Sequence, residues 1–284
     1  MNLILNIYKE KSLSSFDVIR FLRRKLHEKR IGFQGTLDVF AEGVLPVFTG
    51  EFTKIIPFIQ DSEKEYRFKI VLGILTDTLD MTGKVLNTSK EKPNISKSDV
   101  EEAVKKNFMH DYLQRVPAYS AVKINGTPAY KLARRGEEVA TPSKKVIIKS
   151  FEIESSNGNE IIGKIVVSPG FYVRQFANDL AKKLFTFGVL SELTRTRSGN
   201  FRIEDSIRMA DADEFKSISV KNALKEKMET VYINEEQMKD LKNGRPADYC
   251  CGEKRIVLAM TEDDKECVVA ETYENKIKAK RVIY

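Results

Sequence analysis

The sequence predicts an α+β fold: a large domain of interleaved strands and helices, followed by a small C-terminal β-rich domain. Strand-like and helix-like segments follow one another in mixed order, without the regular alternation typical of a parallel α/β sheet. The 284 residues are 42% hydrophobic and 31% charged, which is ordinary for a globular protein and excludes wholesale disorder. Beyond residue 230 the chain is nearly neutral and dominated by short β runs. We therefore predict domains at residues 1–229 and 230–284.

The N-terminal segments are short. Residues 3–7 alternate between apolar and polar side chains and predict a strand. Ser14 and Asp17 are typical of a helix N-terminus, where a hydroxyl caps the first turn and an acid complements the dipole. The expected helix has an apolar face formed by Val18, Leu22 and Leu26. Glycines within residues 32–50 then indicate loops between short buried segments.

Three elements are expected in the middle of the chain. Residues 66–72 alternate and predict a strand, and residues 77–83 predict a polar turn. A helix is expected to begin at Ser96, and its buried face contains Val100, Val104 and Phe108.

The following segments predict a hairpin and a helix. Residues 146–153 and 161–167 are rich in β-formers, and a turn is expected at residues 155–159. The helix after Gly170 has an apolar face formed by Val173, Phe176, Ala177, Leu180 and Leu184. Residues 210–228 form a further amphipathic stretch. In the tail, which is expected to begin near Val231, the predicted strands are residues 255–260, 267–270 and 279–283.

Positive charge is concentrated in the larger domain. The net charge is +7, but residues 1–229 carry 38 basic and 30 acidic side chains, whereas residues 230–284 carry 10 and 11. Clustered Lys and Arg are typical of nucleic-acid binders, because each phosphate contact releases condensed counterions. A solvated basic helix face is the alternative interpretation. The two clusters are Arg20, Arg23, Arg24, Lys25, Lys29 and Arg30, and Lys131, Arg134, Arg135, Lys144, Lys145 and Lys149.

The sequence argues against several classes of protein. Its apolar runs are far shorter than the about 20 residues that span a bilayer, and its first residues do not resemble a signal peptide. Three cysteines and two histidines, without ligand spacing, argue against a zinc site and a disulfide framework. We expect a cytoplasmic protein whose chemistry falls to carboxylates, Tyr, Lys or Arg.

One carboxylate stands out on a glycine-flanked loop. Asp38 lies between Leu37 and Val39, and Gly32 and Gly35 precede it. Glycines allow the backbone to approach a ligand closely, and active residues are often carried by loops held on a rigid scaffold. From these residues alone, an Asp that only closes a turn is the favoured interpretation.

The loop resembles the signature of the bacterial tRNA pseudouridine synthase B family. That signature reads approximately Gly-His-x-Gly-Thr-Leu-Asp-Pro-x-Ala-x-Gly-Val-Leu-Pro, followed by Gly-x-x-Thr-Lys. The residues that match it are Gly32, Gly35, Thr36, Leu37, Asp38, Ala41, Gly43, Val44, Leu45, Pro46, Gly50, Thr53 and Lys54.

Four further blocks resemble the family in the same order, so that the likeness covers residues 3–205. They are Lys64–Arg67; Thr76–Gly83; Pro117–Gly126, continuing to Tyr130, Ala133, Arg134 and Gly136; and Gly170–Arg174, continuing to Asp179, Leu180 and Leu193–Gly199.

The resemblance implies a catalytic domain of the pseudouridine synthase type, with a mixed, mainly antiparallel sheet. It implies an isomerase that converts uridine 55 in the T-loop of tRNA to pseudouridine after flipping the base into a pocket. The implied partner is the T-arm of tRNA, and no metal, nucleotide or redox cofactor is implied. We expect a monomer that does not associate with membranes.

The resemblance also implies the site residues. Asp38 would be the catalytic carboxylate, Arg174 its ionic partner, and Tyr66 the ring that stacks on the target base. Taken alone, Tyr66 would be a core aromatic of a strand, and Arg174 a surface arginine that the dipole of its helix mildly disfavours. Leu193 would line the base pocket. The other implied substrate-binding residues are Phe33, Gly35, Thr36, Leu37, Lys54, Asp80, Tyr119, Lys123 and Tyr172.

The chain departs from the family pattern in several places. Phe33 replaces a histidine that supports the flipped RNA conformation, and Val39 replaces the proline after the catalytic Asp. Glu10 and Ser12 replace the proline and glycine of an N-terminal Lys-Pro-x-Gly element, and Val116 replaces a proline. None of these changes removes a group from the reaction, but they favour a divergent member or a different RNA.

The tail resembles a short form of the PUA RNA-binding domain, although a β appendage packed on the catalytic domain is the alternative. Removal of residues 231–284 is expected to weaken binding and to leave the chemistry intact. Two other functions are weighed: a tRNA-folding chaperone with weak or lost catalysis, and a glycosidase-like enzyme. The latter needs a second carboxylate that no block supplies.

Overall fold

The computed structural model describes residues 1–283, with side chains for all of these except residues 212–214. The chain forms two compact units. Unit 1 contains residues 1–39, 43–61 and 197–284, and unit 2 contains residues 40–42 and 62–196. The predicted boundary at residue 230 stays a prediction, because the tail here groups with the N-terminal segments.

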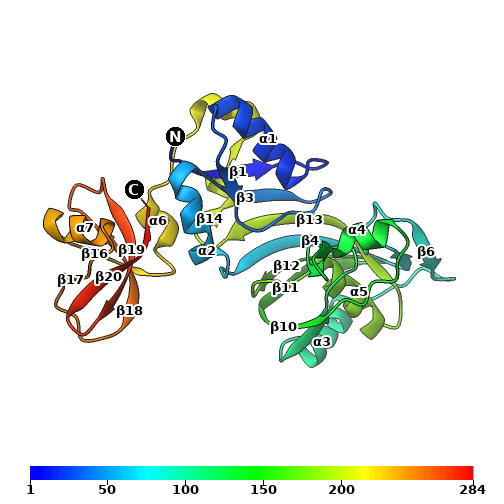
Figure 1. The fold of residues 1–284 in the computed structure, drawn as a ribbon. Helices are drawn as coiled ribbons and strands as arrows, with labels where there is room; N and C mark the ends of the chain where they lie inside the picture. The colour runs from blue at the N-terminus through cyan, green and yellow to red at the C-terminus, as the bar shows by residue number, and fades with distance from the viewer. Residues whose placement is uncertain (284) are drawn as a thin grey trace. The chain divides into compact units, whose positions relative to one another are not determined.

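Unit 1 begins with a group of strands around β1 (Ile4–Lys9). β1 pairs antiparallel with β3 (Glu42–Thr49) and parallel with β15 (Ile207–Arg208), and β2 (Ile31–Phe33) pairs with β3. Helix α1 (Ser15–Leu26) packs on these strands through Val18, Ile19 and Leu22 (Figure 1). The remaining elements are η1 (Gly50–Ile55), α2 (Ile56–Ile59), β14 (Phe201–Arg202), η2 (Ile203–Asp205), η3 (Met209–Glu214) and α6 (Val220–Leu224).

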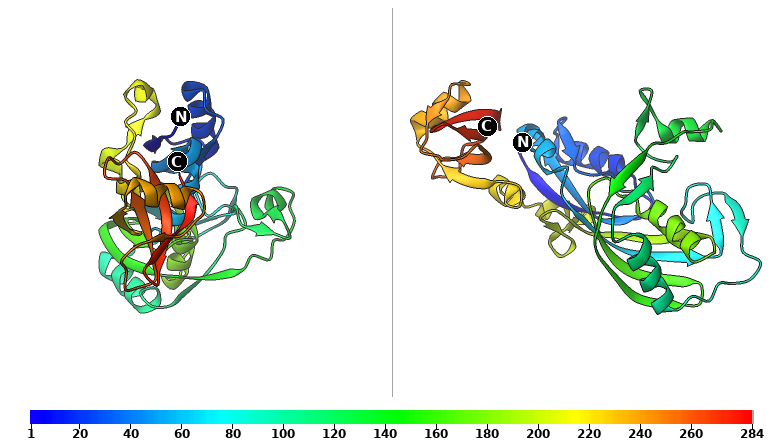
Figure 2. Two further views of the ribbon diagram at one scale, coloured as in Figure 1. Left: turned by 60° about the vertical axis from the view of Figure 1, so that its left-hand side comes forward. Right: turned by 90° about the horizontal axis from the view of Figure 1, so that it is seen from below.

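The tail of unit 1 is a five-stranded sheet with strand order β16-β18-β19-β20-β17, and helix α7 packs against it (Figure 2). Its elements are β16 (Glu229–Tyr232), α7 (Glu235–Lys242), β17 (Ala247–Asp248), β18 (Arg255–Met260), β19 (Cys267–Tyr273) and β20 (Lys276–Val282). One face of the sheet has its own core with α7, and the other shares a core with the N-terminal part: Leu258 and Val269 belong to one cluster with Phe52 and Ile55. Removal of the tail would therefore uncover apolar side chains.

Unit 2 contains strands in the sheet order β11-β12-β4-β13, in which β12 pairs antiparallel with both β11 and β4. Helices α3 and α5 cover one face of it, where Phe176 contacts Phe68, Phe108 and Phe151 (Figure 1). The main elements are β4 (Lys64–Leu72), α3 (Lys97–Asn107), β11 (Ile148–Asn157), β12 (Glu160–Val167), α5 (Val173–Lys183) and β13 (Gly188–Ser198). The smaller elements are β5 (Ile74–Thr76), β6 (Val85–Thr88), β7 (Tyr112–Arg115), β8 (Lys123–Ile124), β9 (Thr127–Pro128), α4 (Ala129–Arg134) and β10 (Ser143–Val146).

The predicted α+β class with mainly antiparallel pairing is confirmed, whereas two local predictions differ from the structure and one helix was not predicted. The hairpin strands stay paired as far as Asn157 and Glu160, so that the turn is only Gly158 and Asn159. The amphipathic stretch at 210–228 contains one short α-helix, α6. Helix α7 was not predicted, because only Met238 and Leu241 mark its buried face.

Candidate functional site

The Asp38 segment is a loop between β2 and β3, and both neighbours of Asp38 are held by hydrogen bonds. The Ser15 hydroxyl accepts a hydrogen bond from the Leu37 amide at 3.0 Å and donates one to the Leu37 carbonyl at 3.3 Å. The Ser12 amide donates to the Val39 carbonyl at 2.9 Å. Asp38, which is half-buried, is thus carried on a backbone that is fixed on either side.

A buried lysine supports the segment that holds this loop. Lys9 is 0% exposed, and its ammonium donates hydrogen bonds to the carbonyls of Glu10 (3.1 Å) and Leu13 (2.7 Å). These bonds brace the turn in which Ser12 has a φ of 68°. From the sequence, Lys9 was expected only as the first residue of the N-terminal element that departs from the family pattern at Glu10 and Ser12. The position of Lys9 at the end of an apolar strand was the sequence signal that could have indicated this structural role.

The other end of the loop is anchored by Gln34, which is buried. Its amide donates to the Pro46 carbonyl, and its side-chain Nε2 donates to the Ile59 carbonyl, both at 2.9 Å. Its Oε1 accepts a hydrogen bond from the Ser198 hydroxyl at 2.7 Å. Gly35 follows with a φ of 71°, a conformation that favours glycine. Gly35 and Thr36 are exposed, so the rigid loop presents backbone to solvent beside Asp38.

Two other predicted residues of unit 1 have protein contacts. Phe33 packs edge-on against Phe16 of α1, with ring centroids 5.4 Å apart. Lys54 forms an ion pair with Glu51 and donates a hydrogen bond to the Val282 carbonyl at 3.0 Å. This bond ties η1 to the end of the tail, so Lys54 has a structural role whether or not it also contacts substrate.

In unit 2, Arg174 joins two loops. It is the second residue of α5 and only 5% exposed. Its Nη1 donates to the Thr78 carbonyl at 2.8 Å, and its Nη2 donates to the Tyr119 carbonyl at 2.9 Å. Its Nη1 also lies 3.7 Å from Oδ2 of buried Asp80. A fork-shaped guanidinium can make such divergent bonds at once, whereas an ammonium is a point charge.

Asp80 organises the loop that faces Arg174. Its Oδ1 accepts hydrogen bonds from the Thr78 hydroxyl (2.9 Å), the Thr82 amide (2.9 Å) and the Thr82 hydroxyl (2.5 Å). The Met81 amide donates to the Leu190 carbonyl of β13 at 2.9 Å, which fixes the loop on the sheet. Asp80 is therefore a positioning residue for the two carbonyl-bearing loops as well as a charge partner of Arg174.

Tyr119 and Tyr172 are held close to this group. The Tyr119 hydroxyl donates to Oδ2 of Asp77 at 3.2 Å, and burial, followed by that carboxylate, raises the pKa of Tyr119 above its ordinary 10.0. The backbone of Tyr172 is held by buried Gln114: the Tyr172 amide donates to Oε1 (2.8 Å), and Nε2 donates to the Tyr172 carbonyl (3.0 Å). Gln114 was not predicted; it sets the entry into α5.

A second buried pair fixes the body of α5. The Tyr112 hydroxyl donates to Asp179, and the Gln175 amide group donates to the other oxygen of Asp179 at 2.8 Å. Burial, followed by the Asp179 carboxylate, raises the pKa of Tyr112 far above its ordinary value. Tyr112 therefore stays protonated and remains a hydrogen-bond donor throughout the physiological pH range.

The last predicted residues of unit 2 lie on strands. Tyr66 is 7% exposed on the face of β4 that also carries Phe68, and Leu193 is 4% exposed on β13. Lys123 of β8 is exposed. The structure thus brings Arg174, Asp80 and Tyr119 together in unit 2, and the residues from Phe33 to Asp38 together in unit 1.

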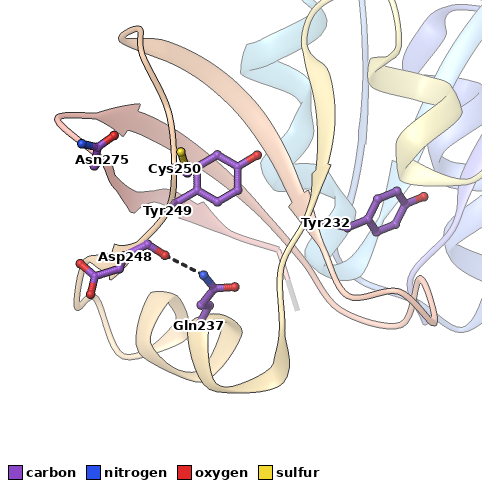
Figure 3. Close-up of a pocket in the computed structure, with 6 residues that line it drawn as sticks. All are labelled: Tyr232, Gln237, Asp248, Tyr249, Cys250 and Asn275. Carbon is purple, nitrogen blue, oxygen red and sulfur yellow. Dashed lines mark hydrogen bonds between the residues drawn. The ribbon is translucent and has the colours of Figure 1, made fainter.

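The chain has a shallow hollow of about 520 Å³ on the tail. Its lining residues include Tyr232, Tyr249 and Cys250, and it contains a 2.6 Å hydrogen bond from Gln237 to the Asp248 carbonyl (Figure 3). No predicted site residue lines it. Among the side chains of residues 1–211 and 215–283, no cluster of three from His, Cys, Asp or Glu could hold a metal ion. No helix in the described part of the chain is long and apolar enough to cross a membrane.

Solved structures confirm the fold. Superposition on a chain of an H/ACA RNP bound to a substrate RNA containing 2'-deoxyuridine gives a TM-score of 0.73 at 18% identity, over 99% of this chain and 85% of that one. A chain of a Cbf5-Nop10-Gar1 complex gives the same TM-score and coverage at 20% identity. At these identities the likeness concerns the fold alone.

Sequence comparison is more specific. A protein named tRNA pseudouridine synthase B from Clostridium tetani is 40% identical over 248 residues, covering 86% of this chain and 85% of that protein. One of the same name from Geotalea uraniireducens is 43% identical over 203 residues, covering 72% and 65%. Residues 23–173, more than half of the chain, match the family model for the TruB family pseudouridylate synthase (N terminal domain). With the signature loop, the sheet and these relatives in agreement, the chain belongs to the TruB family of pseudouridylate synthases.

Proposed function

We propose that this protein converts uridine 55 in the T-loop of tRNA to pseudouridine. The observation that carries the proposal is the Asp38 loop, which matches the family signature and is fixed by Ser12, Ser15 and Gln34. A carboxylate on a rigid, partly exposed loop suits a reaction at a base that has been flipped out of its stack. The relatives' name supports tRNA as the substrate. We also propose that the enzyme works in the cytoplasm as a monomer.

The reaction is an isomerisation, so atoms balance within the substrate. The bond between the ribose C1′ and the uracil nitrogen breaks, the base rotates, and a bond forms between C1′ and a ring carbon. That carbon loses its proton, and the released nitrogen gains one. Asp38 promotes the first step, either as a nucleophile at C1′ or the ring, or by stabilising positive charge at C1′. No redox partner or energy source is needed.

The other proposed roles follow from the family match. Arg174 keeps Asp38 ionised and oriented, and its bonds to the Thr78 and Tyr119 carbonyls favour a fixed guanidinium. Tyr66 stacks on the target base, and Leu193 lines its pocket. The remaining predicted residues contact the substrate: Phe33, Gly35, Thr36, Leu37, Lys54, Asp80, Tyr119, Lys123 and Tyr172.

The experiment that tests the proposal uses unmodified tRNA transcript and chemical mapping of pseudouridine. Wild-type protein is expected to modify position 55, and Asp38→Asn to bind the transcript without modifying it, because phosphate contacts supply most of the affinity. Asp61→Asn, at an exposed position after α2, is the matched control and should retain activity. Modification by Asp38→Asn would exclude the catalytic assignment, and loss of binding would make Asp38 structural.

A second candidate is a tRNA-folding chaperone with weak catalysis. Phe33 favours it, since the ring packs on Phe16 and cannot make the hydrogen bonds of the family histidine. In that case wild type and Asp38→Asn would accelerate tRNA refolding equally, while the rate of modification stayed near zero for both.

A further inference from the structure

One face of helix α1 forms an exposed aromatic and basic stripe that the proposed chemistry does not use. Phe16, Arg20, Arg23 and Arg24, here named the α1 stripe, are all exposed. Their spacing of four, seven and eight residues places them along one side of the helix. The opposite side buries Val18, Ile19 and Leu22. The arrangement gives the helix a buried core face and a solvent face on which basic and aromatic groups predominate, with the acidic Asp17 beside Arg20.

The stripe begins at the Asp38 loop. The Phe16 side chain is 67% exposed, yet its ring meets the Phe33 ring at a centroid distance of 5.4 Å and an angle of 89°. The residue before it, Ser15, makes the two hydrogen bonds to Leu37. The Phe16 ring therefore offers a flat apolar surface to solvent beside the loop. An aromatic ring with only a packing role would be buried in the core.

The positive charge of the stripe is only partly neutralised by the protein. Asp17 pairs with Arg20, Glu28 with the N-terminal amine, and Glu51 with Arg30. Among the side chains that the structure describes, those of residues 1–211 and 215–283, none forms an ion pair or hydrogen bond with the guanidinium groups of Arg23 and Arg24. Both lie in the last turn of α1, where the helix dipole favours cations. Two adjacent exposed guanidinium groups that pair with none of the described carboxylates are suited to bind phosphates.

We infer that the α1 stripe binds the RNA strand that flanks the target nucleotide, with Arg23 and Arg24 on phosphates and Phe16 against an unpaired base. The inference rests on the proposed function and extends it, since it names a binding surface outside the signature blocks. Guanidinium groups bind phosphates through two hydrogen bonds at once, and aromatic side chains stack on any of the bases. Contact between Phe16 and Phe33 places the stacked base next to the Asp38 loop.

The double variant Arg23→Gln/Arg24→Gln tests the phosphate contacts. Binding of T-arm RNA is measured over a range of salt concentrations. If both residues contact phosphates, the magnitude of the slope of log K against log salt falls by about 1.4 to 1.8, since each contact contributes about 0.7 to 0.9. The control is Lys105→Gln/Lys106→Gln, because these are also adjacent, exposed and in the last turn of a helix, α3. It is expected to leave the slope unchanged. Equal slopes for wild type and the Arg23/Arg24 variant would overturn the inference.

Phe16→Leu tests the stacking contact, because it retains an apolar side chain but removes the ring. Affinity for T-arm RNA is expected to fall about tenfold, within the range for loss of one base stack. Fluorescence of 2-aminopurine placed beside the target uridine should be less quenched than with wild type. Unchanged affinity and quenching would exclude the base contact, and thermal unfolding checks that α1 is intact.

The outcomes separate this inference from the proposed function. If wild type forms no pseudouridine, the proposed function fails whatever the salt slopes are. If wild type is active and the α1 variants bind RNA as it does, only the inference fails. An acidic membrane is the competing occupant of the α1 stripe. If Arg23→Gln/Arg24→Gln lost binding to phosphatidylglycerol vesicles but bound RNA as wild type does, the stripe would be assigned to lipid.

Discussion

Ser15 and Leu37 form a reciprocal pair in which one hydroxyl holds both backbone polar groups of the residue before Asp38. The two residues are 22 positions apart, and both side chains are buried. The pair joins the first turn of α1 to the signature loop. Whatever displaces α1 therefore displaces the backbone that carries Asp38.

Ser15→Ala should slow the chemistry more than it weakens RNA binding. The change leaves the buried Leu37 amide without its acceptor, at a cost of about 1–3 kcal/mol in the free energy of unfolding. Single-turnover rates and urea unfolding measure the two effects. Ser168→Ala is the control, because Ser168 likewise accepts a backbone hydrogen bond, from the Ile147 amide at 2.9 Å, and does not contact the loop. An unchanged rate in Ser15→Ala would show that the pair is not needed for catalysis.

Acid should weaken the N-terminus of α1 only at low pH. Hydrogen bonds from the Ser14 hydroxyl, and next from Arg20, lower the pKa of Asp17 from 3.8 to about 2. A lowered pKa in the folded state means that Asp17 contributes stability above pH 3.8 and that this contribution is lost as pH falls toward 2. The difference in urea midpoint between wild type and Asp17→Asn should be constant from neutral pH down to about pH 4 and then shrink. A difference that disappeared near neutral pH would contradict the assignment.

Local sequence signals predicted local structure well. Ser14 with Asp17 and Ser96 with Asp99 form the capping boxes that their spacing indicates, and β4 alternates as expected. These signals depend on residues within a few positions of one another, so they can be recognised in a single sequence.

The contacts that build the candidate site could not be predicted from local sequence patterns. The bonds from Ser15 to Leu37, from Gln114 to Tyr172 and from Arg174 to Thr78 span 22, 58 and 96 positions. Whether a hydroxyl or amide faces solvent or a distant backbone depends on the tertiary fold. The family resemblance predicts roles for Asp38 and Arg174, but it does not predict that Lys9, Ser15 and Gln114 hold the neighbouring backbone in place.

Removal of residues 231–284 should destabilise the catalytic part. The tail contributes Leu258, Met260 and Val269 to the core that contains Phe52 and Ile55. Exposing a large apolar side chain costs about 1.5–3 kcal/mol, so the truncated protein should unfold at a markedly lower temperature. Lys54→Gln is the control, since it removes the bond to the Val282 carbonyl and the ion pair with Glu51 but uncovers no core side chain, and it should shift the midpoint little. A truncation that unfolds at the wild-type temperature would instead support an independent domain at 230–284.

Phe33→His should be tolerated and should change RNA affinity more than the chemical step. The histidine restores the family residue, and it retains a ring that can meet Phe16. We expect an altered apparent Kd for tRNA transcript and a single-turnover rate within about threefold of wild type, a difference of less than 1 kcal/mol in barrier height. Phe33→Leu separates the ring from the hydrogen bond. A rate loss in Phe33→His as large as that of Asp38→Asn would place this position in the chemistry itself.

The last prediction treats Asp38 and Arg174 as one functional unit. Asp38→Asn removes the proposed nucleophile and the negative charge, so turnover should vanish while tRNA binding survives. Arg174→Ala should also strongly reduce the rate, because it removes the proposed ionic partner of Asp38. It also removes the guanidinium that donates to the carbonyls of Thr78 and Tyr119.

If both side chains serve one step, their losses are strongly non-additive, and the double variant should be scarcely slower than Asp38→Asn alone. Arg174→Lys is the informative control: the charge is retained, but an ammonium cannot reproduce the two divergent guanidinium bonds, so a partial rate should remain. Single-turnover rates on one tRNA transcript measure all four variants. Additive losses would show that Arg174 acts elsewhere, most simply on a phosphate of the RNA. A wild-type rate in Arg174→Ala would confine Arg174 to holding the Thr78 and Tyr119 loops.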